Sequence, residues 1–216
     1  RGRRARASVK QRLGRRDDEL VMLFTPPFDK SRLDPGYIKG YVPGVRENGG
    51  QYTHAAIWAA MAFAKLGDSA RAWELLAMIN PVNHSRDAAA VAVYKTEPYV
   101  YAEYLVGPEH PYLYGEGAFT WITGTAGWNF MAGTEWILGA RRDFEGLRVD
   151  PCIPSHWKKC SIKRPFRKAV YEIDIENPKG KGHGVKEVYV DGRKISGNLI
   201  EPHGDGKTHK VRVILG

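Results

Sequence analysis

Hydrophobic residues recur with helical spacing through the first two thirds of the chain. They dominate residues 55–66 and 69–79, and this spacing predicts two helices. Thr53 stands where a residue that caps the first helix is expected, and Gly67 stands where that helix should end. Asp68 is placed to start the second helix. The sequence therefore predicts two helices joined by a very short turn.

Three more stretches are predicted to be helical, namely residues 5–13, 98–106 and 126–138. Pro98 suits the first position of a helix, where its missing N–H group costs no hydrogen bond. Gly139 is positioned to end the last of these helices. The chain up to residue 146 is thus expected to be mainly helical.

Beyond residue 146 the pattern changes to one that is typical of β-strands. β-branched and aromatic residues alternate or cluster in short segments that turn residues separate. The predicted strands are residues 160–164, 169–176, 185–190 and 209–215. Asp191 and Gly192 lie between two apolar runs, which is a strong signal for a β-hairpin. We therefore predict an antiparallel β module in this part of the chain.

Length and composition are those of an ordinary globular protein, with 216 residues and 43% hydrophobic residues. The formal net charge of +9 is local, because residues 1–16 hold eight basic side chains and no acidic one. These basic residues are not interleaved with aromatic ones, and no nucleic-acid-binding motif accompanies them. A solvated helix face explains them better, so we expect no nucleic-acid partner.

No apolar run is long enough to span a membrane, and the chain does not open with a signal-peptide pattern. We therefore expect a soluble, cytoplasmic segment that makes no membrane contact itself, although a longer protein that contains it could be tethered to the inner membrane. Cys152 and Cys160 are too few for a disulfide framework and lack partners for a zinc site. Reduced thiols are the expectation, and no metal is predicted.

Candidate ligand-binding residues concentrate in residues 36–54, where five glycines and a proline predict a loop. The loop offers aromatic rings, fixed charges and hydrogen-bonding groups, and this mixture suits a polyhydroxylated ligand. The residues are Tyr37, Tyr41, Arg46, Glu47, Asn48, Gln51, Tyr52 and His54. The alternative is a structural loop whose polar groups satisfy its own backbone.

A second candidate is the stretch 121–128, where small residues and hydroxyl groups open a predicted helix. Free backbone N–H groups and the helix dipole could hold an anion there. A plain N-terminal cap would use the same threonine, Thr123, so the pattern alone leaves both interpretations open.

Four runs occur in one order: PGYIKGYVPGVRENGGQYTHAAIW, EPYVYAEYLVG, WITGTAGW and LRVDPCIPSHW. Together they resemble the inverting glycoside phosphorylases of the cellobiose, chitobiose and cellodextrin type, and most closely the phosphorylase-like C-terminal part of cyclic β-1,2-glucan synthases. The resemblance implies an α+β fold, in which residues 1–146 are the C-terminal portion of an (α/α)6 barrel and residues 147–216 an antiparallel β domain. Five predicted helices are too few for such a barrel, so we expect the remainder of the barrel, or a second chain, to complete it.

The resemblance also implies the chemistry. In this family phosphate replaces water in an inverting cleavage of a β-glucan or glucose disaccharide, which gives a sugar 1-phosphate. Phosphate is then a co-substrate and no cofactor is needed. His54, Thr123 and Gly124 match the family's phosphate-binding positions. Tyr41, Arg46 and Glu47 match its sugar-contacting positions.

Two departures from the family pattern matter. The catalytic acid, an aspartate in a D-W-N-D type of motif, has no counterpart here, and neither does a phosphate-binding arginine. Both lie upstream in the family, so no catalytic residue is expected in this chain. Glu103 falls where relatives have a glutamine, and a carboxylate there would repel phosphate unless it is protonated or turned away. A non-catalytic carbohydrate-binding or structural module of a larger cyclic β-1,2-glucan synthase is therefore the alternative function.

Other aromatic and imidazole side chains give weaker signals. Histidines outside the loop show no metal-ligand spacing and are interpreted as surface or loop residues: His84, His110, His156, His183, His203 and His209. Five tryptophans at helical positions are predicted to be core residues: Trp58, Trp73, Trp121, Trp128 and Trp136.

Overall fold

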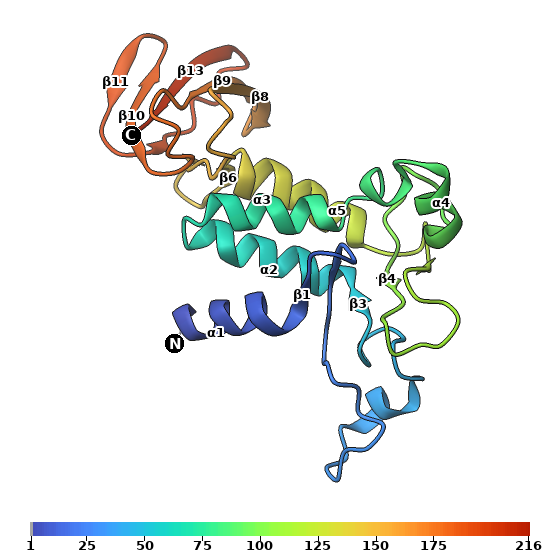
Figure 1. The fold of residues 1–216 in the computed structure, drawn as a ribbon. Coiled ribbons are helices and arrows are strands. Elements are labelled where there is room, and N and C mark those ends of the chain that lie inside the picture. Colours follow the sequence, from blue (N-terminus) through green and yellow to red (C-terminus); the bar gives the residue numbers. More distant parts are fainter. Residues whose placement is uncertain (1) are drawn as a thin grey trace. The chain divides into compact units, whose positions relative to one another are not determined.

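The structure, a computed structural model, describes residues 2–216 (Figure 1). Arg1, one of the eight basic residues of the N-terminal segment, lies outside the described residues. The chain forms two compact units. Unit 1 comprises the described residues up to Ala60 together with Glu74–Asn129, and unit 2 comprises Met61–Trp73 and Phe130–Gly216. The fold is of the mixed α+β kind, whereas the division of domains at residue 146 stays a prediction.

The N-terminal helix is present and longer than predicted. Helix α1 spans Gly2–Ser8 and continues as a π-helical turn, η1, over Val9–Leu13. The short strands β1, Gly14–Arg15, and β2, Leu20–Val21, then pair in antiparallel fashion. Within the described residues, no helix is long and apolar enough to cross a membrane.

Helices α2 and α3 occur where the sequence predicts them. They span Thr53–Lys65 and Ser69–Met78. Gly67 ends α2 with a positive φ of 73°, which glycine adopts without strain, and its N–H group donates to the Ala64 carbonyl. The Asp68 carboxylate accepts a hydrogen bond of 3.3 Å from the Arg71 backbone N–H group, which is an N-terminal cap for α3.

The prediction that Thr53 caps α2 is wrong. Thr53 is the first residue inside the helix and is buried, and its hydroxyl oxygen finds no hydrogen-bond partner in the described chain. Its backbone N–H group instead donates to the Glu103 carbonyl at 2.8 Å. The backbone of a neighbouring segment, rather than a local side chain, therefore fixes the start of α2.

The predicted helix at residues 98–106 is also wrong. Its last part is strand β4, Tyr104–Leu105, which lies between β3, Gln51–Tyr52, and β5, Gly117–Ala118. The Glu103 N–H group, just before β4, donates to the carbonyls of Ala118 and Phe119. Hydrogen bonds from strands on both sides outweigh the weak helix preference of this segment.

A helix that the sequence analysis missed precedes this segment. Helix α4 spans Ala88–Tyr94, and the Asp87 carboxylate caps it by accepting a 2.8 Å hydrogen bond from the Ala90 N–H group. Its C-terminal cap, Lys95, has a left-handed φ of 54°. An aspartate followed by a run of alanines is a recognisable helix start, so this signal was present in the sequence. Unit 1 also contains two 3-10 turns, η2 at Gly36–Gly40 and η3 at Asn83–Ser85.

The core of unit 1 joins its irregular segments. Buried side chains from the β2 region, from α4 and from the β4 region pack together, namely Leu20, Met22, Tyr94, Ala102 and Leu105. The half-buried Leu13 lies against this cluster. Two loops also approach each other closely at Gly49 and Gly107. A β-carbon added to Gly107 would lie 2.1 Å from the Gly49 carbonyl oxygen, so glycine is required there.

Unit 2 begins its β structure after a helical segment that the sequence predicts well. Helix α5, Thr125–Met131, continues as a π-helical turn, η4, over Ala132–Ile137, and Gly139 follows with a φ of 73°. A small antiparallel sheet has the order β12-β7-β6. Its strands are β6 at Ala140–Arg142, β7 at Leu147–Val149 and β12 at Leu199–Ile200.

The larger sheet of unit 2 has five strands in the order β11-β10-β13-β9-β8 (Figure 1). They are β8 at Lys159–Phe166, β9 at Ala169–Glu176, β10 at Val185–Val190, β11 at Arg193–Ile195 and β13 at Thr208–Leu215. All four predicted strands are present. The hairpin between β10 and β11 turns at Asp191 and Gly192, both with positive φ, as predicted.

The β module is not wholly antiparallel, which corrects the prediction. Strand β13 pairs with β9 in parallel, from Thr208 opposite Val170 to Ile214 opposite Glu176. After β11 the chain leaves this sheet to contribute β12 to the smaller sheet, and it then returns as β13 between β9 and β10. A long connection of this kind permits parallel pairing, whereas a tight hairpin does not.

Candidate functional site

The loop of residues 36–54 is held in part by its own polar side chains, as the structural alternative proposed. Asn48 is 1% exposed, and its amide donates to the Tyr41 carbonyl and accepts from the Phe28 N–H group. Gln51 is fully buried and accepts a hydrogen bond from the Val21 N–H group at 2.8 Å. These two amides therefore build the loop, and the other polar residues remain candidates for ligand contact.

Arg46 lies at the centre of this group and has a left-handed φ of 51°. Its guanidinium carbon lies 5.2 Å from the centroid of the Tyr41 ring, 5.6 Å from that of Phe119 and 6.0 Å from that of Tyr52. One of its N–H groups donates to Glu103 at 2.7 Å. Burial opposes the charge, but the hydrogen bond with Tyr52 and the charge of Glu103 raise the pKa of Arg46, so it stays cationic.

Glu47 belongs to the same group. Its Oε1 atom accepts a hydrogen bond of 3.4 Å from the Tyr37 hydroxyl, and its Oε2 atom lies 3.8 Å from Arg46 Nε. Both Glu47 Oε2 and Arg46 Nε are buried atoms, and neither has a hydrogen-bond partner within residues 2–216. The two side chains are 25% and 15% exposed, so it is their other atoms that a ligand could reach. The structure thus brings Tyr41, Arg46 and Glu47 together.

Glu103 is engaged by two donors. Its Oε1 atom accepts hydrogen bonds from Arg46 at 2.7 Å and from the Tyr52 hydroxyl at 2.8 Å. Burial, together with the hydrogen bond to Glu103, raises the pKa of Tyr52, which therefore remains a donor. The carboxylate is thus paired with a cation, and this pairing reduces the repulsion that a free carboxylate would exert on an anion.

His54 follows this group at the start of α2. Its ring stacks on Tyr52 with a centroid distance of 5.7 Å and an interplanar angle of 24°, and it meets the edge of Trp58 at 6.3 Å. The backbone of Gly124 lies beside it, because a β-carbon added to Gly124 would be 3.4 Å from His54 Nε2. The two sequence-predicted residues are therefore neighbours, although they are far apart in the chain.

The Thr123 side chain makes hydrogen bonds within its own segment. Its hydroxyl oxygen accepts a hydrogen bond of 3.2 Å from the Thr125 N–H group and lies 2.7 Å from the Thr125 hydroxyl. This turn satisfies one free N–H group at the start of α5, although Gly124, rather than Thr123, is the residue directly before the helix. The contacts leave room for both roles, since one hydroxyl can accept from the backbone and donate to a ligand. The phosphate assignment of His54, Thr123 and Gly124 stays a prediction.

The prediction of core tryptophans is wrong, because three of the five are exposed and the other two, Trp128 and Trp136, are only half-buried. Trp58, Trp73 and Trp121 are 51%, 36% and 69% exposed. Trp58 contacts the Trp128 ring edge to face at 5.4 Å. The Trp121 indole donates to Glu97 at 2.9 Å and lies near the exposed Tyr99. Aromatic faces are therefore accessible next to the candidate phosphate loop.

A separate cavity of about 450 Å³ in unit 1 contains none of the sequence-predicted binding residues. Its acidic lining residues are Asp17, Asp18, Glu19 and Asp87. His84 also lines it and stacks on Tyr94, and burial lowers the pKa of His84. This acidic cavity does not suit phosphate, so the loop of residues 36–54 is the better candidate site.

Sequence reasoning missed one participant in the site, Phe119, whereas Tyr52 was among its candidates. Phe119 covers Arg46, and Tyr52 joins Glu103 to His54. Phe119 also has a positive φ of 54°, which a phenylalanine rarely adopts. No local pattern marks Phe119, because the pairing of β4 with β5 brings it to the loop.

Comparison with known proteins identifies the family. The profile of the glycosyl hydrolase 94 superfamily, catalytic domain, matches residues 1–139. The chain belongs to this superfamily, and the family predicted from the four sequence runs is confirmed.

Several curated proteins resemble the chain along most of its length. The cyclic beta-(1,2)-glucan synthase NdvB of Rhizobium meliloti (strain 1021) is 41% identical over 185 residues, which are 86% of this chain and 6% of that protein. The N,N'-diacetylchitobiose phosphorylase of Vibrio proteolyticus is 38% identical over 194 residues, 90% of this chain and 24% of its own length. The solabiose phosphorylase of Paenibacillus borealis is 35% identical over 198 residues, which are 89% of this chain and 24% of that protein. The chain thus spans about a quarter or less of each of these relatives.

Proposed function

We propose that this chain supplies the phosphate- and sugar-binding part of an inverting phosphorylase site that acts on β-linked glucosides. The observation that carries the proposal is the position of the His54 ring beside the Gly124 backbone. Two loops that the family pattern assigns to phosphate thereby meet, although 69 residues separate His54 from Thr123. This proximity favours a catalytic part over a purely structural module.

Phosphate binding needs oriented donors near the anion. The His54 ring, the Thr123 hydroxyl and the backbone at Gly124 can supply them. The stacking of His54 on Tyr52 fixes the direction of the imidazole ring. Hydrogen bonds to a charged group are stronger than neutral ones, so even one such donor contributes measurably to phosphate binding.

We assign sugar binding to the group of residues around Arg46. The Arg46 guanidinium can donate to a sugar hydroxyl and the Glu47 carboxylate can accept from one, and both side chains are partly exposed. Tyr41 offers a flat face next to them. We infer a glucose unit in β-1,2 or β-1,4 linkage as the substrate class, because relatives are named for a β-1,2-glucan and for disaccharides.

The reaction would proceed by inversion. Phosphate attacks the anomeric carbon while a carboxylic acid protonates the glycosidic oxygen from the opposite face, and the products are a sugar 1-phosphate and a free sugar hydroxyl. We assign that acid to the rest of an (α/α)6 barrel, outside these 216 residues. The isolated chain is then expected to bind but not to turn over, since general acid catalysis typically contributes about 10² to 10⁴ in rate.

The test uses the gene product that contains this chain, assayed for phosphate uptake or release with glucose disaccharides and β-1,2-glucans. His54→Ala should weaken phosphate use by about 1.5 to 3 kcal/mol, the range for a hydrogen bond to a charged group, with little change in sugar affinity. His156→Ala, at an exposed histidine of unit 2, is the control. An equal loss of sugar and phosphate affinity in His54→Ala, or no loss at all, would contradict the phosphate assignment.

A further inference from the structure

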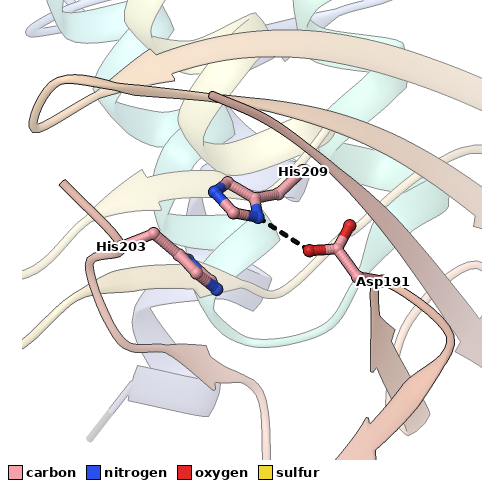
Figure 2. A group of neighbouring side chains, drawn as sticks. All are labelled: Asp191, His203 and His209. Carbon is pink, nitrogen blue, oxygen red and sulfur yellow. Dashed lines mark hydrogen bonds and ion pairs between the residues drawn. The ribbon is translucent and has the colours of Figure 1, made fainter. Parts of the chain in front are cut away.

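Three potential metal ligands converge in unit 2, and none of them is among the binding residues that the sequence predicts. Figure 2 shows Asp191 and His209 joined by a hydrogen bond, with the His203 ring facing that of His209. One donor atom from each of the three lies within 4.8 Å of the others. They come from three segments: the β10–β11 turn, the connection between β12 and β13, and strand β13.

The interpretation of His209 as a surface or loop residue is wrong, because it lies in a strand and is only 6% exposed. Its Nδ1 atom is 2.7 Å from Asp191 Oδ2, and its Nε2 atom is 3.1 Å from Asp205 Oδ1. Asp191 is itself fixed, since its Oδ1 atom accepts a 2.9 Å hydrogen bond from the Lys210 N–H group. Asp191 thus directs Oδ2 at His209.

His203 is oriented by a buried tyrosine. Its Nδ1 atom lies 3.1 Å from the hydroxyl oxygen of Tyr171, which also accepts from the His203 backbone N–H group. Tyr171 is fully buried in the core of unit 2. The other ring nitrogen, Nε2, is therefore the one left for a ligand. The His203 and His209 rings stack with centroids 3.7 Å apart.

We propose that Asp191, His203 and His209 form a binding site for a divalent transition-metal ion of the zinc class. Two imidazoles and one carboxylate are the ligand set that such ions favour, with water completing the coordination. The second polar atom of each ligand already has a partner outside the site. Asp191 Oδ1 is held by the Lys210 N–H group, His203 Nδ1 by the Tyr171 hydroxyl, and His209 Nε2 by Asp205. Outer partners of this kind orient metal ligands and fix the histidine tautomers.

Metal binding requires a small rearrangement. Bonds of about 2.0 to 2.2 Å place the donor atoms of a tetrahedral zinc site about 3.3 Å apart, so His203 must tilt out of its stacked position. His203 is exposed, and Gly204 and Gly206 follow it with positive φ, so this segment can move at little cost. The ion would replace the proton that lies between His209 Nδ1 and Asp191, and that proton would be released.

The site would tie the β10–β11 turn and the segment around His203 to strand β13. Magnesium and calcium ions prefer oxygen ligands, so they should not compete at a site with two imidazoles. The inferred role is structural stabilisation of this edge of unit 2, independent of the phosphorylase chemistry proposed for unit 1.

Calorimetric titration of the 216-residue chain with Zn²⁺ at about pH 8 tests the proposal. We expect one ion per chain, no heat with Mg²⁺, and an absorption spectrum of four-coordinate cobalt when Co²⁺ is used instead. His203→Ala should lower the zinc affinity at least tenfold, because it removes a ligand without disturbing the core. Asp205→Asn, which alters an outer partner, should lower it about 10-fold to 100-fold.

His156→Ala is the matched control, because His156 is also an exposed histidine of unit 2. It should leave the zinc affinity unchanged. Circular dichroism should show that all variants remain folded. The proposal is overturned if wild-type protein binds no Zn²⁺, or if His203→Ala and Asp191→Asn bind it as tightly as the wild type does. An equal loss in His156→Ala would show adventitious binding instead.

Discussion

The two units of this chain use their hydrophobic residues differently. In unit 2, strand β9 buries every second side chain: Ala169, Tyr171, Ile173 and Ile175. In unit 1, the strands are two residues long, and most of the exposed large hydrophobic side chains of the described chain lie there. Tyr37 and Tyr99, for example, are 71% and 70% exposed. A regular sheet is specified by alternation, whereas the irregular segments of unit 1 leave aromatic faces exposed.

This contrast also shows how each unit fixes its backbone. Unit 2 pairs its strands in long ladders, and β8 with β9 runs without interruption from Lys159 opposite Glu176 to Phe166 opposite Ala169. Unit 1 depends on single contacts, such as the approach of Gly107 to Gly49 and the ion pair of Arg46 with Glu103. Substitutions should therefore affect the two units by different mechanisms.

The largest effect is expected from Ile173→Ala. Ile173 is 1% exposed in the middle of β9, so truncation leaves a cavity in the core of unit 2 and should cost about 4 kcal/mol of unfolding free energy. Chemical denaturation gives the magnitude, and amide hydrogen exchange should show faster exchange in β8–β13. Asp174→Ala, at the exposed neighbouring position, is the control. Similar losses in both variants would mean that alternation does not define this core.

Gly107→Ala should be the most damaging small substitution in unit 1, at about 2 to 3 kcal/mol. The added methyl group would lie 2.1 Å from the Gly49 carbonyl oxygen, so the two loops must separate. Thermal unfolding measures the loss. Gly127→Ala is the matched control, because a β-carbon there meets nothing within 4 Å and alanine favours the helix. Equal stability of the two variants would refute the close packing of these loops.

Glu103→Gln should cost about 1 to 2 kcal/mol, because Arg46 loses a charged hydrogen-bond acceptor in a mostly buried place. The Tyr52 hydroxyl can still donate to the amide oxygen, which limits the loss. Urea denaturation provides the measurement, and the exposed Glu109→Gln is the control. If both variants were as stable as the wild type, the Arg46–Glu103 pair would contribute nothing to unit 1.

The smallest expected effect is a loss of stability at low pH, which arises from Asp143 in unit 2. Hydrogen bonds from Arg148, above all other causes, hold the pKa of Asp143 below its usual value. A group with a lowered folded-state pKa stabilises the protein above its unfolded pKa, near 3.9, and this stabilisation is lost as the pH falls through the folded value. We expect a small fall in melting temperature below about pH 4.

Arg148→Gln sharpens this test, because it removes both donors to Asp143. The fall in melting temperature between about pH 5 and pH 3 should then be smaller than in the wild type, and carboxyl NMR shifts should show the Asp143 pKa nearer its usual value. An unchanged pKa in this variant would show that Arg148 is not its cause.

The sequence by itself determined the elements that short-range chemistry dictates. Alternation in residues 169–176 gave β9 with its bounds, and Asp191-Gly192 gave the hairpin because both residues tolerate positive φ. Gly67 and Gly139 marked the helix ends correctly. For the candidate site, the family pattern selected His54 and Gly124, and the structure brings them together.

Only the tertiary structure decided features that depend on partners far along the chain. Residues 98–106 look helical by composition, yet β3 and β5 supply the hydrogen bonds that make Tyr104–Leu105 a strand. The parallel pairing of β13 with β9 follows from the route of the chain through the smaller sheet. His203 and His209 show no metal spacing, and packing on Tyr171 brings them together. Periodicity records which face is buried, but it does not record which segment buries it.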